Sequence, residues 1–500
     1  MAYFLGIDVG TTLVKALVAD EAGRVVEEAG VEYGYSQPHP GWAEQNAEDW
    51  WGCLKQVTRA VAGRLAEPPV ALALSTHGDT MVPVDADNHP LLPARLWLDN
   101  RTAAQVARLV DQVPQQQWLE VTGSRLAAYA AAASLAWWAD ERPAIFARAA
   151  RFCLVQDYLT ARLTGRHLAD APNASRTLIF DLHTRDWCEA LLAAVGVERE
   201  RLPVAAESGT PVGNLTREAA GELGLPPETL VVLGAHDQTA AAIGCGAVKP
   251  GTVMLSTGTA WVVLGAADEL HIDPGGRLQT YCHAMPGGIA ILGAYAGGSL
   301  LRWARDNFSQ LADADAADYD TIVAEAQAAE QAGRGPLVFL PHFYGSGPPL
   351  RRTYALGALT GLQLQHTRAD IYLALLRGVA TQTAAALATM AEMGYDIGEV
   401  RMIGGGAQSD FWAQLVADAH GAPLELPVVS EAAAYGAAML AAIGSGHLAS
   451  AEQVAERVAI RKQIVPRPQA SAVAPEWHTR YLEALDGTWQ ALAGYRAEYR

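Results

Sequence analysis

The feature that most constrains the fold is residues 4–20, where a polar turn separates two apolar segments. Residues 4–7 and 13–18 are mostly apolar and predict two strands. The turn between them contains Asp8, Gly10, Thr11 and Thr12. Glycine permits a tight turn whose N–H groups converge on an anion, and threonine hydroxyls add donors. The turn therefore predicts a phosphate site, although a plain hairpin remains an equal alternative at this point.

Two charged residues refine that prediction. Asp8 would repel a bare phosphate, so it suits the turn only beside a cation such as Mg²⁺. Lys15 would add a positive charge to the same site.

A second stretch, residues 253–265, repeats the plan with Thr257, Gly258 and Thr259 between two apolar segments. Two such units far apart indicate a duplicated architecture holding a nucleotide between related domains. The chain has no Gly-x-x-x-x-Gly-Lys-Ser/Thr phosphate loop.

The size and charge of the chain restrict its class. Five hundred residues fit two or more domains, and the small residues at 245–250 predict the junction, giving domains 1–245 and 246–500. The formal net charge of −18 opposes binding to nucleic acid or an anionic membrane. It does not exclude ATP, because a local pocket can be positive on an acidic protein.

The cysteines and apolar runs favour a cytoplasmic location. The five cysteines form no Cys-x-x-Cys pair, which fits a reducing compartment. We expect no secretory signal, because the first residues lead directly into a strand. The apolar run at 126–139 is too short to span a bilayer. The oligomeric state stays open, with a homodimer as one alternative.

Candidate acceptor-binding residues lie in the first half. His77 follows a buried strand at 70–75, where α/β folds bind ligands, or it is a hydrogen-bonded structural histidine. Trp42 is either a core residue or the wall of a sugar site. Asp99 belongs to a polar group after the aromatic anchor Trp97.

Asp237 lies between a strand at 230–233 and a helix at 239–243. It is either the cap of that helix or a general base that polarises a substrate hydroxyl. Near the other end, Gly404, Gly405 and Gly406 separate a strand from a helix capped by Ser409. Such glycines let a flat group approach the backbone near a helix N-terminus, unless they form only a tight loop.

Together these segments resemble the FGGY family of carbohydrate kinases, and within it the xylulokinases. The matching motifs occur in family order at residues 6–12, 39–45, 96–102, 234–238, 255–259 and 404–409. The resemblance implies an α/β fold of two ribonuclease-H-like domains, the actin/Hsp70/hexokinase superfold, around a central cleft that holds ATP and Mg²⁺. It places the sugar site and catalytic base in the first domain and nucleotide binding in the second.

The resemblance also implies residue roles. Asp237 and Asp8 are the expected catalytic residues and metal ligands. The expected ATP-binding residues are Gly10, Thr11, Thr12, Lys15, Thr257, Gly258, Thr259, Gly405, Gly406 and Ser409. The expected substrate-binding residues are Thr76, His77, Gly78, Asp99, Asp237, Gln238 and Trp42.

The implied activity is ATP-dependent phosphorylation of a terminal hydroxyl of a neutral ketose, first D-xylulose. The sugar pocket departs from the family pattern, because residues 75–78 read Ser-Thr-His-Gly where xylulokinases usually have Gln-Met-His-Gly. Ribulose and polyols such as erythritol are therefore alternative acceptors. The alternatives of another class are a non-metabolic ATPase and a catalytically inactive sugar-binding regulator.

Overall fold

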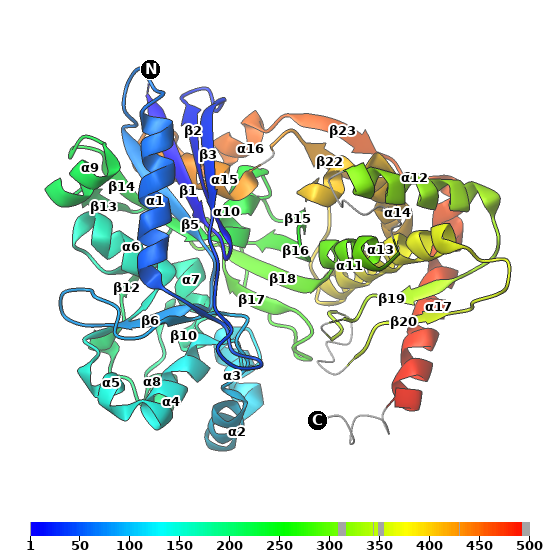
Figure 1. Cartoon of the computed structure of the whole chain (residues 1–500), viewed down its shortest axis with the longest axis horizontal. Coiled ribbons are helices and arrows are strands. Elements are labelled where there is room, and N and C mark those ends of the chain that lie inside the picture. Colours follow the sequence, from blue (N-terminus) through cyan, green and yellow to red (C-terminus); the bar gives the residue numbers. More distant parts are fainter. Residues whose placement is uncertain (1, 309–316, 344, 349–354, 430, 493–500) are drawn as a thin grey trace. The chain divides into compact units, whose positions relative to one another are not determined.

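A computed structural model describes residues 2–308, 317–343, 345–348, 355–429 and 431–492 (Figure 1). The chain forms two compact units that each contain separate segments. Unit 1 comprises Met1–Pro250, Ala266–Ala290 and Glu431–Val458, and unit 2 comprises Gly251–Gly265, Ile291–Ser430 and Ala459–Arg500. The main division falls after Pro250, the last residue of the predicted junction and five residues beyond the predicted domain boundary, and two later segments return to unit 1.

Unit 1 is built on a mixed sheet with the strand order β13-β14-β5-β1-β2-β3. The strands are β13 (Pro211–Asn214), β14 (Leu230–His236), β5 (Ala71–Thr76), β1 (Tyr3–Val9), β2 (Leu13–Asp20) and β3 (Val25–Glu32). The strands β1, β5 and β14 run parallel, whereas β1–β2 and β2–β3 are antiparallel pairs. The parallel strands therefore place their carboxyl ends at one edge of the sheet.

The remaining elements of unit 1 complete its layers. A second sheet has the order β4-β7-β6-β8, formed by β4 (Glu44–Gln45), β7 (Ala94–Arg95), β6 (Met81–Val84) and β8 (Arg151–Leu154). The short strands are β9 (Leu168–Asp170), β10 (Phe180–Asp181), β11 (Asp186–Trp187), β12 (Val204–Ala206) and β17 (Gln279–Cys282). The helices are α1 (Ala47–Ala62), α2 (Ala103–Gln112), α3 (Gln115–Thr122), α4 (Ala131–Glu141), α5 (Pro143–Arg148), α6 (Val155–Thr164), α7 (Ala171–Arg176), α8 (Glu189–Val195), η1 (Arg199–Arg201), α9 (Arg217–Leu223), α10 (Asp237–Gly244), α15 (Ala432–Gly444) and α16 (Ala451–Arg457).

Unit 2 contains a second mixed sheet with the order β18-β16-β15-β21-β22-β23. These strands are β18 (Ile289–Ala296), β16 (Ala260–Ala267), β15 (Thr252–Thr257), β21 (Glu399–Ile403), β22 (Leu424–Pro427) and β23 (Ile460–Ile464). The other elements are α11 (Gly298–Phe308), α12 (Ala317–Ala332), β19 (Val338–Leu340), β20 (Ala358–Thr360), α13 (Arg368–Glu392), η2 (Gly405–Gln408), α14 (Asp410–His420) and α17 (Pro468–Leu492).

The two sheets share one plan, as the repeated turn pattern predicts. In unit 1, the antiparallel hairpin β1–β2 is followed by two strands parallel to β1, namely β5 and then β14. In unit 2, the hairpin β15–β16 is followed in the same way by β21 and β22. Each polar glycine turn therefore lies at the end of the first strand of its unit.

Small residues let α15 pack directly onto the sheet and onto α10 within unit 1 (Figure 1). A Cβ atom on Gly6 of β1 would lie 1.9 Å from the carbonyl oxygen of Ala434. A Cβ on Gly436 would lie 1.8 Å from the carbonyl oxygen of Ala240. These contacts place α10 against the end of the sheet, and Asp237 is the first residue of that helix.

The helix α13 is long and apolar enough to cross a membrane by length and composition. However, 72% of its most apolar window is buried inside the protein. The apolar composition of α13 is therefore explained by its burial in the core of unit 2.

We expect Gly436→Ala to destabilise the protein, because its added methyl group would overlap the Ala240 carbonyl. Overpacking of a core typically costs about 1–3 kcal/mol, and backbone atoms yield less than side chains. Gly52→Ala in α1 is the matched control, because nothing lies within 4 Å of its added Cβ. Urea unfolding midpoints measure both changes, and equal midpoints for the two variants would contradict the packing argument.

Candidate active site

The first glycine turn joins β1 to β2 and carries several hydrogen-bonding groups. The Gly10 N–H donates to the Leu13 carbonyl at 3.1 Å, which closes the turn. The indole Nε1–H of Trp97 donates to the Thr11 hydroxyl at 3.0 Å. The Thr12 side chain is exposed. In the described part of the chain, the N–H groups of Thr11 and Thr12 donate to no protein acceptor, so they remain available to an anion.

Asp8 lies at the end of β1, one residue before Val9 ends the strand. The Ser75 hydroxyl donates a 2.6 Å hydrogen bond to its Oδ1 atom. Burial raises the pKa of Asp8 to about 6, and the Ser75 hydrogen bond and the Lys15 charge only partly oppose this shift. The Lys15 ammonium itself forms a 2.5 Å ion pair with Glu431, so a phosphate would have to compete for it.

Asp237 follows β14 directly and begins α10. Burial, and then the negative charge of Asp8, raise the pKa of Asp237 to about 7. His236 occupies the N-cap position of α10, and no side-chain capping hydrogen bond is formed there. The capping interpretation of Asp237 therefore loses its support. The side chain of Asp237 stays 29% exposed, which leaves it accessible to a ligand.

Asp8 and Asp237 suit a divalent cation. Each is a carboxylate, the oxygen ligand that Mg²⁺ prefers. Burial is the main cause of the raised pKa of each carboxyl, and the charge of Asp8 further raises the pKa of Asp237, so a nearby cation would favour the ionised forms. These two residues would hold the metal.

The end of β5 and the segment that follows it bring Thr76, His77 and Gly78 to the same edge of the sheet. The Thr76 hydroxyl accepts a hydrogen bond from Asn173 at 3.1 Å. The Nδ1 atom of His77 lies 2.9 Å from the Val9 carbonyl, while its Nε2 atom is buried without a partner among the described residues. Burial lowers the pKa of His77 to about 4, so its imidazole is neutral.

Gly78 lies against His236, the residue before Asp237, and Gln238 is the residue after Asp237. A Cβ on Gly78 would lie 2.6 Å from the His236 ring, so only glycine allows this close approach. The Gln238 side chain contributes a hydrogen bond that lowers the pKa of Asp237. The Oε1 atom of Gln238 is buried and has no partner among the described groups.

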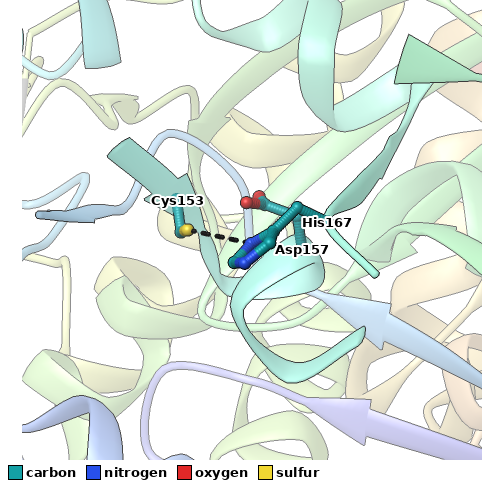
Figure 2. A group of neighbouring side chains, drawn as sticks. All are labelled: Cys153, Asp157 and His167. Carbon is teal, nitrogen blue, oxygen red and sulfur yellow. Dashed lines mark hydrogen bonds between the residues drawn. The ribbon is translucent and has the colours of Figure 1, made fainter. Parts of the chain in front are cut away.

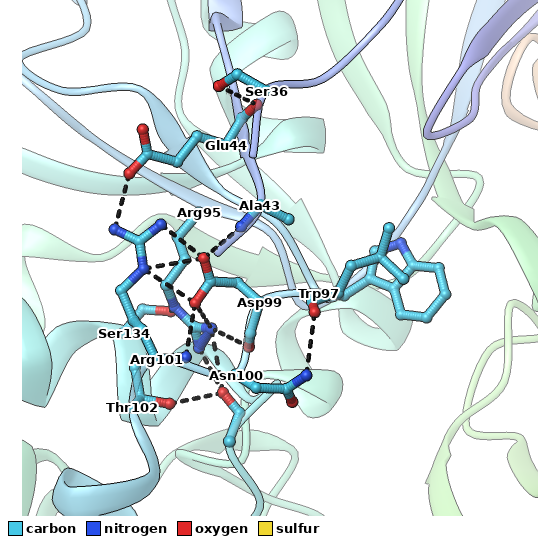
Figure 3. Close-up of polar contacts among 12 residues, drawn as sticks. Ser36, Ala43, Glu44, Arg95, Trp97, Asp99, Asn100, Arg101, Thr102 and Ser134 are labelled. Carbon is cyan, nitrogen blue, oxygen red and sulfur yellow. Dashed lines mark hydrogen bonds and ion pairs between the residues drawn. The ribbon is translucent and has the colours of Figure 1, made fainter. Parts of the chain in front are cut away.

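The structure places Asp99 in a network of internal hydrogen bonds and ion pairs (Figure 3). Asp99 is fully buried, and its carboxylate receives the Arg101 guanidinium at 2.6 Å and the Ala43 N–H at 2.6 Å. Arg95 supplies a second positive charge 3.8 Å away. Both carboxylate oxygens are thus used to hold the loop, and we remove Asp99 from the proposed acceptor site.

Trp42 belongs to the same internal network. The guanidinium carbon of Arg101 lies 3.4 Å from the centroid of the Trp42 ring. The edge of Trp137 contacts the ring as well, with the centroids 5.6 Å apart. Trp42 is half-buried and packed against Arg101 and Trp137, so we do not include it in the proposed acceptor site.

In unit 2, Thr257 connects the second turn to the glycine loop. Its hydroxyl donates to the Ile403 carbonyl at 2.5 Å and accepts from the Ala407 N–H at 3.3 Å. A Cβ on Gly406 would lie 2.9 Å from the Thr257 side chain. The second turn and the glycine loop therefore lie side by side, as the sequence alone could not establish.

The other expected ATP-binding residues of unit 2 differ in their exposure and in their hydrogen bonding. Gly258, Thr259 and Gly405 are exposed. A Cβ on Gly258 would meet only the Ala260 carbonyl at 3.7 Å, so the protein itself leaves room on that side. The Ser409 hydroxyl accepts the Trp412 N–H and caps α14, which commits it to the helix.

Comparison with known proteins identifies the family. The domain described as "FGGY family of carbohydrate kinases, N-terminal domain" matches residues 3–244, and its C-terminal counterpart matches residues 253–445. The chain belongs to the FGGY family of carbohydrate kinases. It is therefore a phosphotransferase with an alcohol group as acceptor, and this membership removes the support for a non-metabolic ATPase or a sugar-binding regulator.

Individual relatives differ in their named substrates. A xylulose kinase of Escherichia coli K12 is 31% identical over 474 residues, covering 94% of this chain and 96% of that protein. A glycerol kinase of Bordetella parapertussis is 33% identical over 470 residues, covering 90% of each. The crystal structure of a xylulose kinase from Rhodospirillum rubrum has a TM-score of 0.89 at 30% identity and covers 99% of each chain. The fold is the actin/hexokinase-like fold of FGGY kinases.

Sequence reasoning missed Asp79, Arg176 and Tyr281 of unit 1. These residues lie near His236, which directly precedes Asp237. Arg176 forms a 2.6 Å ion pair with Asp79, and its guanidinium carbon lies 5.4 Å from the Tyr281 ring centroid. The Tyr281 hydroxyl lies 3.5 Å from Nδ1 of His236. The available signal was Asp79 directly after the candidate segment, but no local pattern indicates Arg176.

A separate group, Cys153, Asp157 and His167, places three potential metal ligands together (Figure 2). Cys153 Sγ lies 3.6 Å from His167 Nδ1. Local structure already explains two members, because Asp157 accepts the Leu154 N–H at the start of α6 and Cys153 packs in the core.

Asp8 and Asp237 predict how the stability of the metal-free protein changes with pH. Their folded pKa values of about 6 and about 7 exceed the ordinary value of 3.8. Their protonated forms therefore stabilise the fold fully below about pH 4, and this contribution is lost as the pH rises through 6 and 7. Urea midpoints in chelator should fall less steeply between pH 5 and 8 for Asp237→Asn than for the wild type. Parallel curves would show that Asp237 has an ordinary pKa.

The turn after β15 predicts a nucleotide-specific defect. Gly258→Val should raise the KM for ATP much more than the KM for the acceptor, because the added side chain points into space that the protein leaves open. An unchanged thermal midpoint would show that the fold tolerates the substitution. Equal changes in both KM values would place this turn away from the nucleotide.

Proposed function

We propose that this FGGY kinase transfers the γ-phosphate of ATP, with Mg²⁺, to a terminal hydroxyl of a neutral ketose. The leading candidate is D-xylulose, converted to D-xylulose 5-phosphate. The observation that carries the proposal is the Asp237 carboxylate at the start of α10, accessible and with a pKa raised to about 7. A base of that pKa is well matched to proton removal near neutral pH.

Asp237 performs the proton transfer in this proposal. Its carboxylate accepts the proton of the terminal hydroxyl as that oxygen forms a bond to the γ-phosphorus. The bond from the γ-phosphorus to the departing ADP oxygen breaks, and Asp237 later releases the proton to solvent. Mg²⁺ held by Asp8 and Asp237 would neutralise the phosphate oxygens. Loss of such a general base typically lowers the rate about 10²–10⁴-fold.

The two units carry different parts of this reaction. Unit 1 supplies the base and the acceptor-binding groups Thr76, His77, Gly78 and Gln238, together with the phosphate-binding turn at Gly10, Thr11 and Thr12. Unit 2 supplies the turn at Thr257, Gly258 and Thr259 for the phosphates and the loop at Gly405 and Gly406 for the adenosine. We expect Lys15 and Ser409 to contribute less to ATP binding, because their side chains already bind Glu431 and cap α14, respectively.

The choice of D-xylulose rests on the xylulose kinases among the similar chains. A short polyol is the second candidate, because a glycerol kinase is equally similar. Ribulose is a further ketose alternative.

The acceptor is tested by ADP release in the presence of D-xylulose, D-ribulose, erythritol, glycerol and gluconate. We expect the highest kcat/KM for D-xylulose. Asp237→Asn should lower kcat about 10²–10⁴-fold while ATP binding, measured by calorimetry, stays nearly intact. Gluconate as the best acceptor would overturn the proposed substrate class, and near-normal turnover of Asp237→Asn would overturn the assignment of the base.

A further inference from the structure

A buried ion pair between Asp79 and Arg176 lies beside the proposed acceptor residues and has no part in the mechanism above. Asp79 is 4% exposed and Arg176 is 8% exposed. Both guanidinium contacts reach the same carboxylate oxygen, Oδ2, from Nη2 at 2.6 Å and from Nε at 3.2 Å. The other oxygen, Oδ1, is buried and has no hydrogen-bond partner among the described residues. An unsatisfied buried carboxylate oxygen calls for an additional donor.

The backbone of Asp79 is also unusual. Its φ is +60°, in the left-handed region that non-glycine residues seldom adopt. Such conformations persist where surrounding contacts hold them, and they occur often at ligand sites. The Arg176 ion pair is one contact that holds the Asp79 side chain.

The position of Asp79 links it to the base. Gly78 precedes Asp79, and His236 precedes Asp237. A Cβ on Gly78 would lie 2.6 Å from the His236 ring, so the two chain segments touch immediately before the two carboxylates. His236 Nε2 lies 3.3 Å from the Asp237 carboxylate.

Protein groups hold Arg176 through each of its three guanidinium nitrogens. Its Nη1 donates to Gln279 at 2.8 Å, while Nε and Nη2 donate to Asp79. Its guanidinium carbon lies 5.4 Å from the ring centroid of Tyr281 and 5.9 Å from that of Tyr129. All three of its nitrogens already donate to the protein, so a carboxylate of a ligand would have to compete with Asp79 and Gln279 for Arg176.

We propose that Asp79 determines acceptor specificity by accepting, at Oδ1, a hydrogen bond from a second hydroxyl of the acceptor, and that Arg176 is the residue that positions it. This inference rests on the proposed function and deepens it. The acceptor class is a neutral polyhydroxyl compound. A sugar acid that put its carboxylate at this position would face the negative charge of Asp79, and it would have to compete with Asp79 for Arg176.

The first test compares Asp79→Asn with Asp99→Asn, using ATP and either D-xylulose or erythritol. Asp99 is a matched control, because it is an equally buried partner of an arginine with both oxygens occupied. We expect Asp79→Asn to raise the acceptor KM about 10–100-fold, as for loss of a hydrogen bond to a charged group, with little change in the KM for ATP. Asp99→Asn should lower the unfolding midpoint without that split. Equal kinetic effects in the two variants would overturn the proposal.

The second test uses matched acceptors. Erythronate differs from erythritol by one oxidised end, and 1-deoxy-D-xylulose lacks one hydroxyl of D-xylulose. The wild type should prefer each fully hydroxylated neutral compound, and Asp79→Asn should reduce the preference for erythritol over erythronate at least tenfold. The preference for D-xylulose over its deoxy analogue should shrink in the same variant if that hydroxyl meets Asp79. Unchanged ratios for both pairs would contradict the role of Asp79.

Arg176 is tested with Arg176→Gln and Arg176→Lys. A positioning role predicts that Arg176→Gln raises the acceptor KM, that Arg176→Lys restores part of the loss, and that adding Asp79→Asn to Arg176→Gln causes little further change. Simple additivity of the two substitutions would overturn the positioning role.

Different results would overturn the proposed function and the proposed role of Asp79. If the wild type phosphorylates no neutral acceptor, the proposed function and this inference both fall. If Asp237→Asn loses turnover but Asp79→Asn leaves the acceptor KM and both preferences unchanged, only the inference falls.

Discussion

Two carboxylates at strand ends of unit 1, Asp8 and Asp237, are the electrostatic constraint on which the candidate site depends. Burial raises the pKa of each, and the charge of Asp8 further raises the pKa of Asp237. Positive charge from Lys15 and hydrogen bonding from Ser75 oppose the shift at Asp8 without removing it. Without a cation, a site of this kind keeps the pKa of Asp237 at about 7, and a divalent cation beside it would favour the ionised form of both carboxylates.

The geometry of this pair depends on close backbone packing within unit 1. Gly6 admits α15 against β1, and Gly436 admits α10 against α15. Larger residues at either glycine would push the start of α10, and with it Asp237, away from the end of β1. The small residues of α15 thus influence the position of Asp237, although they take no part in the reaction.

Two buried carboxylate–arginine pairs show how similar chemistry serves different purposes. The Asp99 carboxylate is bound by Arg101, Arg95 and a backbone N–H, so nothing in its environment calls for a ligand (Figure 3). The Asp79 carboxylate is bound through one oxygen and leaves the other buried without a donor. The two carboxylates therefore differ in how many of their oxygens already accept hydrogen bonds. Asp99, with both oxygens occupied, holds a loop, whereas Asp79, with one oxygen lacking a donor among the described residues, is suited to a substrate hydroxyl.

Local patterns in the sequence were sufficient for the main elements. Apolar segments on either side of a polar glycine turn predicted both hairpins, and the structure confirms them as β1–β2 and β15–β16. The ordered motifs also indicated the family, which the domain matches confirm. These predictions succeed because strands and turns depend on residues that are close in the chain.

By itself, then, the sequence determined the duplicated strand–turn–strand plan, the family and a set of polar residues at strand ends. Only the tertiary structure decided which of those residues are free. Lys15 meets Glu431 from 416 positions away, and Asp79 meets Arg176 from 97 positions away. Asp99 is different, because Arg101 two residues later was a local sign of its structural role. The physical reason is that a charged side chain is available to a ligand only if the fold brings it no better partner, and most such partners come from distant segments.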